Sequence, residues 1–397
     1  HTGGGGFAVR ALIAAFGHDF RDDDVFLLND PYTAGGNHLP DWVIARPVFV
    51  EGALSGFANI RAHQSDIGGG AAGSYNPEAT EIFHEGIRLP PLLLIRDGHV
   101  RQDLWQLLML NTRTPDLLDG DLRAMIGATR IGAEQIADLF ASLGVAETNA
   151  YLKGVLDHAD RRLRAAVAEL PDGVYLGEDR FEDDCFQPMD IPITVAITIR
   201  GDAMTVDFTG SHPQIRGFKN SSIANTWSGV YTALSSFLGA DIPRNEGTFR
   251  SVEIVAPEGS ILNPRPPAPM TMNTIAPACE IINACWEALG KADPTRSCAG
   301  WGKPGAPVTS GTWPDGRTFV MYHWAAQSGG GAVDGRDGFP QQGGVNSLCG
   351  LVIPNAEAYE QLYPVRVVRQ ELRTDAAGAG QYRGGAGVDY EVEIQRP

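Results

Sequence analysis

The sequence contains few cysteines, and they are not spaced as disulfide frameworks or structural zinc sites require. Only five of the 397 residues are cysteine, an odd number, and they lie at Cys185, Cys279, Cys285, Cys298 and Cys349. None of them forms a CxxC pair. This usage indicates a reducing compartment, so we expect a cytoplasmic protein in which each cysteine is a small buried hydrophobe.

Long apolar runs and an excess of positive charge are also absent. No stretch of about 20 apolar residues appears, so we expect no membrane span, and no basic segment followed by an apolar one resembles a signal peptide. Lys and Arg number 31 against 48 Asp and Glu, which gives a formal net charge of −17. Such a surface repels phosphate backbones and anionic lipid, so neither nucleic acid nor a membrane is an expected partner.

The chain is long enough to divide into two or three subdomains. Hydrophobic residues make up 43% and charged residues 20%, as in ordinary folded proteins. Helical and strand patterns come in blocks, which predicts an α+β fold rich in antiparallel sheet, with several subdomains and an inserted helical region. We predict a metal-site α+β subdomain at 1–100 and a helical hairpin segment at 101–170. An antiparallel sheet with a helix follows at 171–265, and a Gly-rich α+β subdomain at 266–397.

Hydrophobic periodicity places the elements of the first segment. It predicts a helix at 7–17, strands at 25–28, 42–50 and 54–63, and a short helix at 76–86. The last two strands would form a hairpin. That hairpin would bring the end of the second strand back to the start of the first.

The later segments have different patterns. Apolar residues in 101–170 recur at helical spacing, which predicts helices paired as hairpins. Alternating patterns in 171–265 predict antiparallel strands, interrupted by a helix at 223–239. The proline-rich residues 264–269 must be extended and mark a boundary or a rigid crossover, and 277–291 read as another helix.

Polar side chains gather in the loop after the first strand, LLNDPYTAGGNHLPD. Pro40 disfavours a helical conformation before it, so His38 and Asp41 lie in a bent segment where both can face one point. The predicted hairpin returns His63 to the same place. Two imidazoles and a carboxylate are a ligand set for a catalytic Zn²⁺, Mn²⁺ or Fe²⁺ with a position left for water or substrate. Turn chemistry is the alternative: it is favoured for Asp30 alone, and spacing leaves the two interpretations level for the other three.

Two further acidic positions accompany this set. Asp66 could be a fourth ligand, an orienting group or a general base. In TEIFHEG, Glu81 and either His84 or Glu85 would share a helix face and could complete a site, although a solvated helix end is the favoured interpretation. EIFHE lacks the second His of HExxH, which excludes a zincin-type metalloprotease site.

Nucleotide-binding and nucleophile motifs are not found. The Gly-rich stretches SGGG and GAGQYRGGAG contain neither GxxxxGK[ST] nor a GxGxxG between a strand and a helix. If ATP is involved, another chain must bind it. There is no GxSxG motif and no cysteine beside an obvious His partner.

Six stretches resemble, in order, the hydantoinase B/5-oxoprolinase C-terminal family. They are NDPYTAGGNHLPDWVIARPVF, GFANIRAHQSDIGGGAAGSYNPEATEIFHEGIRLPP, DFTGSHPQIRGFKNSS, VAPEGSILNPRPPAP, SGGGAVDGRDG and YPVRVVRQELRTDAAGAGQYRGGAG. The resemblance runs over essentially the whole chain. It implies a hetero-oligomer in which a hydantoinase A-type partner subunit binds ATP and phosphorylates a substrate carbonyl oxygen, while this chain carries a divalent metal.

The resemblance also implies roles for particular residues. The family's metal-binding His and Asp fall on His38 and Asp41, and a further His falls on His63. We therefore expect the metal-bearing subunit of an ATP-dependent amidohydrolase that opens a cyclic amide, namely a hydantoin, 5-oxoproline or a lactam. Asp66 or Glu81 would accept the proton. The alternatives are a subunit of an acetone- or acetophenone-type carboxylase, and a scaffold subunit without catalysis.

Four departures from the family pattern stand out. Gln64 occupies a position where the family usually has a second His. The chain starts at His1 rather than Met, so we expect a processed or trimmed start, without the preceding stretch whose Asp could be another ligand. The family's C-terminal extension is not found. Residues 341–355 diverge from the family, which leaves the carboxylase branch open.

Overall fold

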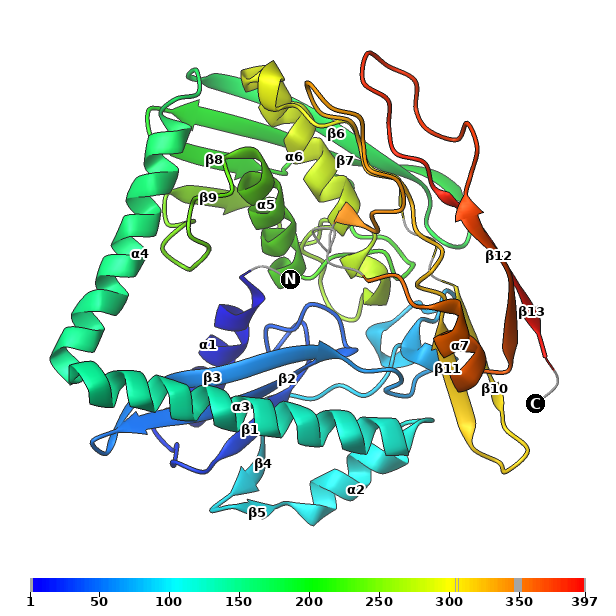
Figure 1. Cartoon of the computed structure of the whole chain (residues 1–397). Helices are drawn as coiled ribbons and strands as arrows, with labels where there is room; N and C mark the ends of the chain where they lie inside the picture. The colour runs from blue at the N-terminus through cyan, green and yellow to red at the C-terminus, as the bar shows by residue number, and fades with distance from the viewer. Residues whose placement is uncertain (1–2, 304, 306, 346–351, 396–397) are drawn as a thin grey trace.

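The computed structural model describes residues 3–303, 305, 307–345 and 352–395. Its architecture is the predicted mixture of helices and small, largely antiparallel sheets, so the α+β fold class is confirmed (Figure 1). Residues 1–2, at the start whose processing we predicted, and residues 346–351, within the divergent stretch 341–355, lie outside the described residues. The four segment boundaries remain predictions. Among the described helices, none is both long enough and apolar enough to cross a bilayer.

The N-terminal sheet has five antiparallel strands in the order β3-β2-β1-β4-β5. The predicted strands in this region are confirmed as β1 (Val25–Leu28), β2 (Asp41–Val50) and β3 (Ala53–His63), and the sheet is completed by β4 (Leu92–Arg96) and β5 (His99–Val100). Helix α1 (Gly4–Phe16) and helix α3 (Pro115–Leu143) cover it, and α2 (Gln102–Leu110) precedes α3.

Strand β2 is buried on both faces, which explains why its sequence is a continuous apolar run. Trp42 and Ile44 pack in one core cluster with Leu122 of α3. Val43 and Ala45 pack in a second cluster together with residues of α1. Because successive side chains of a strand point to opposite faces, two covered faces require apolar residues at every position.

Helices α3 and α4 (Val145–Val167) do not form the expected hairpin, whereas α2 does pack on α3, with Nε1 of Trp105 donating to Asp119 at 3.0 Å. Helix α3 ends at Leu143, and the following Gly144, with a φ of +83°, turns the chain, so that α4 leads away toward the second sheet (Figure 1). The reason lies in the apolar faces. Leu122 of α3 belongs to the core of the N-terminal sheet, whereas Leu163 and Val167 of α4 belong to the core of the second sheet.

The second sheet has the order β6-β7-β8-β9. Strands β6 (Gly173–Asp183), β7 (Pro188–Arg200) and β8 (Ala203–Asp207) are antiparallel as predicted, but β9 (Val252–Val255) pairs with β8 in parallel. This corrects the all-antiparallel prediction. Helix α5 (Ile223–Phe237) lies between β8 and β9 in the chain, and such a crossover returns the chain in the same direction. The predicted helices α5 and α6 (Ala278–Ala292) are confirmed.

The C-terminal part consists of two hairpins and a short helix. They are β10 (Val308–Thr312) with β11 (Thr318–Tyr322), β12 (Val365–Leu372) with β13 (Val388–Ile394), and α7 (Ala356–Leu362). The chain here also makes close backbone crossings that only glycine permits. A Cβ on Gly329 would lie 1.9 Å from the carbonyl oxygen of Gly385.

The prediction of a short helix at 76–86 is wrong. Only the single 3-10 turn η2 (Ile82–His84) forms there, and Glu81 before it is extended. The backbone N–H of Ile82 donates instead to the carbonyl oxygen of Pro267, at 2.7 Å. This contact ties the segment to the proline-rich crossover and replaces the hydrogen bonds that a longer helix would have made.

Candidate metal centre

The loop after β1 is held in place by buried polar side chains. The Asn29 amide donates to the carbonyl oxygen of Leu39 at 2.8 Å and accepts from the backbone N–H of Leu89 at 2.7 Å. The backbone N–H of Asp41 donates to the carbonyl oxygen of His38 at 3.1 Å, which closes the predicted bend. His38 therefore lies beside Asp41, the first residue of β2.

The β2–β3 hairpin supplies the third side chain. Its register places Asp41 directly opposite His63, the last residue of β3. Residues opposite each other in an antiparallel pair have neighbouring side chains on one face of the sheet. The predicted convergence of these side chains therefore follows from strand register.

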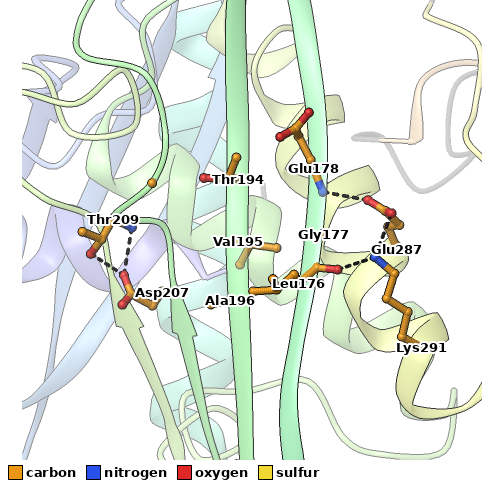
Figure 2. Close-up of a pocket in the computed structure, with 11 residues that line it drawn as sticks. Leu176, Gly177, Glu178, Thr194, Val195, Ala196, Asp207, Thr209, Glu287 and Lys291 are labelled. Carbon is orange, nitrogen blue, oxygen red and sulfur yellow. Dashed lines mark hydrogen bonds and ion pairs between the residues drawn. The ribbon is translucent and has the colours of Figure 1, made fainter.

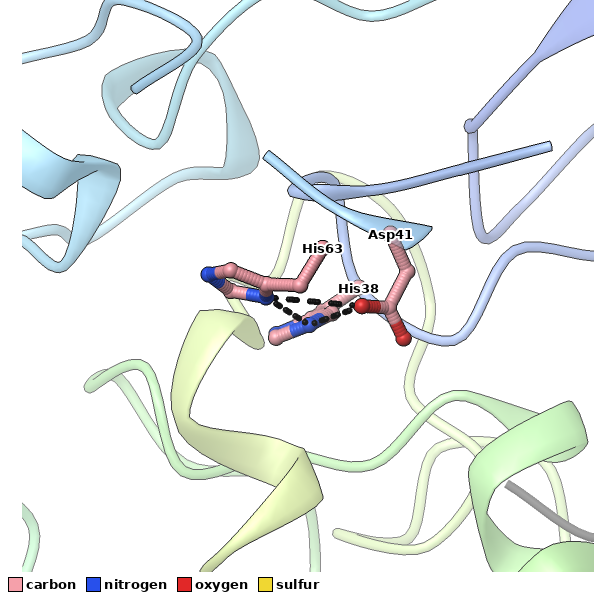
Figure 3. Close-up of side chains that lie close together, drawn as sticks. All are labelled: His38, Asp41 and His63. Carbon is pink, nitrogen blue, oxygen red and sulfur yellow. Dashed lines mark hydrogen bonds and ion pairs between the residues drawn. The ribbon is translucent and has the colours of Figure 1, made fainter. Parts of the chain in front are cut away.

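The three side chains face one point (Figure 3). Nε2 of His38 lies 3.0 Å from Oδ1 of Asp41, and Nδ1 of His63 lies 3.4 Å from the same oxygen and 3.3 Å from Nε2 of His38. Ligand atoms around a tetrahedral zinc ion with bonds of ~2.0–2.1 Å are roughly 3.3 Å apart. The observed separations fit such an ion. Among the described residues, this is the group of His, Cys, Asp or Glu side chains that could hold a metal.

The three side chains of the centre differ in their exposure to solvent. The side chains of His38 and Asp41 are 1% and 4% exposed, whereas that of His63 is 29% exposed. A ligand or a water molecule could therefore approach along His63. The two buried groups would be shielded from bulk solvent, which strengthens their electrostatic interactions.

The charges of the three groups are strongly coupled. Burial lowers the pKa of His38, but the charge and hydrogen bond of Asp41 outweigh it, so this pKa is raised. Burial raises the pKa of Asp41, but attraction to His38 holds it far below its usual range. Burial, together with the neighbouring His38, lowers the pKa of His63. The ionised carboxylate of Asp41 and the neutral imidazole of His63 therefore lie beside a protonated His38. A bound cation would take the place of the second ring proton of His38.

A backbone carbonyl fixes the orientation of His38. Nδ1 of His38 donates to the carbonyl oxygen of Thr271 at 2.6 Å, which leaves Nε2 facing Asp41. Metal-ligating histidines typically donate their other ring nitrogen in this way. Thr271 follows the proline-rich crossover, so this crossover leads from the second sheet to the candidate centre.

Glu85 holds that carbonyl in place. Its buried carboxylate accepts from the backbone N–H groups of Met270 and Thr271, at 2.9 and 2.6 Å. Burial raises the pKa of Glu85 to about 7 despite these hydrogen bonds. Of the acidic residues in TEIFHEG, Glu85 is thus the one connected to the centre, whereas Glu81 is exposed.

Asp66 organises the Gly-rich loop after β3. Its Oδ1 accepts from the backbone N–H of Gly68 at 3.0 Å, and its Oδ2 accepts from that of Gly73 at 2.9 Å. The Arg113 guanidinium forms an ion pair with Oδ2 at 2.9 Å, and the Arg113 backbone N–H donates to Oδ1 at 2.9 Å. Among the roles predicted for Asp66, this arrangement favours an orienting one.

Two other polar residues point away from the centre. Gln64 is 1% exposed and donates to the carbonyl oxygen of Ala62, with its amide 3.5 Å from Sδ of Met125 on α3. The family's second His position is therefore directed into the core of the sheet. Asp30 accepts from the backbone and hydroxyl of Thr33 and pairs with Arg88, as turn chemistry predicts.

Three residues around the centre were missed by sequence reasoning. They are Thr271, Tyr75 and Tyr322. The ring centroid of Tyr75 lies 5.9 Å from that of His63, and the ring of Tyr322 lies 5.8 Å from it on another side. No local pattern marks these residues, because the segments that contain Thr271 and Tyr322 follow the centre by more than 200 positions.

A separate cavity of about 390 Å³ lies on the second sheet (Figure 2). At its rim, Nζ of Lys291 donates to the carbonyl oxygen of Leu176 at 2.6 Å and to Glu287 at 2.9 Å. Glu287 in turn accepts from the backbone N–H of Glu178 at 2.7 Å. These side chains of α6 cap exposed backbone groups of the edge strand β6, which protects the edge from pairing with another chain. The cavity does not include the candidate ligands.

Curated proteins similar to this chain include a caprolactamase subunit and a 5-oxoprolinase. A caprolactamase beta subunit from Pseudomonas jessenii is 35% identical over 97% of this chain and 67% of the relative. A 5-oxoprolinase from Arabidopsis thaliana is 27% identical over all of this chain and 32% of its own length. The chain thus spans about two thirds of the first relative and about one third of the second.

Solved structures show the same fold. The ATP-dependent caprolactamase from Pseudomonas jessenii matches with a TM-score of 0.92 and 34% identity, over 98% of this chain and 67% of the other. A nucleotide-free acetone carboxylase matches with a TM-score of 0.88 and 20% identity, over 98% of this chain and 54% of the other, which shows the fold alone. The family profile described as hydantoinase B/oxoprolinase matches residues 1–397. The resemblance seen in the sequence is confirmed, and the chain belongs to the hydantoinase B/oxoprolinase family.

Proposed function

We propose that this chain is the metal-bearing subunit of an ATP-dependent amidohydrolase that opens a cyclic amide. The substrate class is a hydantoin, 5-oxoproline or a lactam. The observation that carries the proposal is the convergence of His38, Asp41 and His63 in a chain 35% identical to a caprolactamase subunit. These residues would hold a divalent ion, Zn²⁺, Mn²⁺ or Fe²⁺, which supplies polarisation of a carbonyl or acidification of a bound water.

The protein's own groups have separate tasks in this proposal. Asp41 contributes a negative charge that stays ionised, because its pKa is far below the usual range. Thr271, supported by Glu85, keeps Nε2 of His38 directed inward. The partly exposed His63 marks the side from which the substrate approaches. Of the two candidate proton acceptors, Asp66 is held by Gly68, Gly73 and Arg113, so we propose an orienting role for it and propose the exposed Glu81 as the acceptor.

A hydantoinase A-type partner would supply the activation step. The sequence contains neither GxxxxGK[ST] nor a GxGxxG between a strand and a helix. The caprolactamase whose structure is similar is described as ATP-dependent. We therefore propose that the partner binds ATP and phosphorylates the carbonyl oxygen of the substrate. This chain, which is similar to the beta subunit of a caprolactamase, would then complete the ring opening within a hetero-oligomer.

The test uses the complex of this chain with its ATP-binding partner. We expect lactam-dependent ATP turnover and ring opening without bicarbonate, and a loss of ring opening by at least about 100-fold in His63→Ala. The loss should accompany a loss of bound metal. Full ring opening by the variant in the complex would contradict the proposal and favour the scaffold alternative.

A ketone carboxylase subunit is the second candidate function. Its support is the likeness of the fold to an acetone carboxylase, which shows that this architecture also occurs in a carboxylating enzyme. The two candidates differ in their co-substrate. ATP turnover that requires both a ketone and bicarbonate, with no response to a lactam or hydantoin, would decide for the carboxylase.

A further inference from the structure

The hydroxyl of Tyr322 lies against the outer nitrogen of His63. Tyr322 is the last residue of β11, in the C-terminal part of the chain. Its oxygen is 3.4 Å from Nε2 of His63, at the long end of a hydrogen bond, and its ring meets the imidazole edge-on at 87°. The far side of His63 is therefore contacted by a residue 259 positions away in the sequence.

Two carbonyl groups compete for the single proton of this hydroxyl. The Tyr322 oxygen is 2.7 Å from the carbonyl oxygen of Gly73 and 3.1 Å from that of Ser65. Carbonyl oxygens only accept, and two oxygens approach to 2.7 Å when a proton lies between them, so the hydroxyl proton points toward Gly73. The lone pairs of the Tyr322 oxygen then remain for an N–H group of His63.

We propose that Tyr322 is a positioning residue that fixes the tautomer of His63. Nε2 of His63 carries the proton and donates it to Tyr322, which leaves the lone pair of Nδ1 facing the point that it shares with Nε2 of His38, 3.3 Å away. The two histidines would then bind a metal through different nitrogens, Nε2 of His38 and Nδ1 of His63. This inference rests on the proposed metal centre and adds to it the residue that sets ligand geometry.

The loop next to Tyr322 is built to admit its hydroxyl. Gly73 has a φ of +75°, and a Cβ at this position would lie 3.1 Å from the Tyr322 oxygen and 2.9 Å from Cγ1 of Val308. The backbone N–H of Gly73 donates to Asp66, which helps to hold the residue whose carbonyl oxygen accepts from Tyr322. Asp66, Gly73 and Tyr322 thus form a chain of contacts that ends at His63. The orienting role predicted for Asp66 is exerted through this chain.

The tautomer is measured directly on the wild-type protein. Long-range ¹H–¹⁵N correlation spectra of the ¹⁵N-histidine-labelled chain report which nitrogen carries the proton, and His63→Gln assigns the signal among the nine histidines. We expect the proton of His63 on Nε2 in the metal-free chain and zinc coordination through Nδ1 in the loaded chain. A proton on Nδ1 in the metal-free chain, or zinc on Nε2, would overturn the proposal.

A variant tests the energetic consequence. Tyr322→Phe removes the hydroxyl but keeps the ring, and we expect its zinc dissociation constant to rise about 10-fold. The matched control is Tyr175→Phe, which removes the hydroxyl of a tyrosine on β6 that donates to the carbonyl oxygen of Pro171 at 2.8 Å. Because this hydroxyl lies outside the candidate centre, the variant should bind zinc as the wild type does. Wild-type affinity in Tyr322→Phe would overturn the proposal.

A second variant is Gly73→Ala, whose Cβ would lie 3.1 Å from the Tyr322 oxygen and so crowd the hydroxyl without removing it. We expect its zinc affinity to fall as in Tyr322→Phe, and unchanged affinity would count against the proposal. If either variant fails to fold, the spectra of the wild-type protein still show which nitrogen of His63 carries the proton. The outcomes also separate the two proposals, because a wild-type chain that binds no metal refutes the metal centre, whereas an inverted tautomer refutes only the role of Tyr322.

Discussion

Nδ1 of His38 lies 2.6 Å from the carbonyl oxygen of Thr271, although the two residues are 233 positions apart in the sequence. The contact joins a loop of the N-terminal sheet to the segment that follows the proline-rich crossover. It directs the inner nitrogen of His38 toward Asp41. The candidate metal centre therefore depends on how two parts of the chain pack together as well as on its local motif.

The first prediction concerns the carboxylate that holds Thr271. The pKa of Glu85 is about 7 in the folded chain against 4.5 for an ordinary Glu, so between these values the folded state binds more protons than the unfolded state. The free energy of unfolding should therefore fall as the pH rises from about 4.5 to 7. Relative to Glu85→Gln, the metal-free wild type should lose up to about 3 kcal/mol over this range. Denaturant midpoints with parallel pH profiles for the two proteins would contradict this.

The second prediction separates two roles for Asp66. Because its carboxylate accepts from Gly68, Gly73 and Arg113, Asp66→Asn should lower the free energy of unfolding by about 2–3 kcal/mol. It should also weaken zinc binding, through the contact of Gly73 with Tyr322. Denaturant unfolding and metal titration measure these effects. A variant as stable as the wild type that binds metal normally but has lost turnover would instead identify a general base.

The third prediction concerns Glu81, the exposed proton acceptor that we propose. Glu81→Gln should leave the metal content and the unfolding midpoint unchanged, since the side chain lies on the surface. In the complex, kcat should fall about 100-fold while KM changes little. Steady-state kinetics with a lactam substrate measure both constants. An unchanged kcat would exclude Glu81 and direct attention to another acceptor.

The fourth prediction tests the family's second His position. Because Gln64 packs toward Met125 and away from the candidate ligands, Gln64→His should add no ligand. We expect an unchanged metal stoichiometry and a free energy of unfolding lower by about 1–2 kcal/mol, as the ring is forced into a packed core. A variant that binds metal more tightly than the wild type would show that position 64 can reach the centre after all.

Local pattern was sufficient to predict the convergence of the candidate ligands. Pro40 bends the chain between His38 and Asp41, and the alternation of two adjacent strands predicts the hairpin that places His63 opposite Asp41. Each of these features depends on neighbours within a few residues or on one short turn. Strand register then converts sequence spacing directly into spatial proximity.

Features that depend on tertiary packing could not be predicted. Helical spacing placed either His84 or Glu85 beside Glu81, whereas the extended backbone at Glu81 and the contact of Glu85 with Thr271 depend on packing. Amphipathic periodicity showed that α3 and α4 each bury one face, yet it does not tell which sheet covers that face. Tyr322 and Thr271 carry no local signal, since their partners come from a distant part of the chain.

The central claim is that His38, Asp41 and His63 bind a divalent metal. The most direct measurement is the metal-to-protein ratio of the purified chain by elemental mass spectrometry, for the wild type and for Asp41→Asn. Asn keeps the size of the side chain but removes the charge that neutralises the bound cation. We predict close to one equivalent of zinc, manganese or iron in the wild type and at least a 10-fold lower content in the variant. Equal metal contents in the two proteins, whether near zero or near one, would contradict the account.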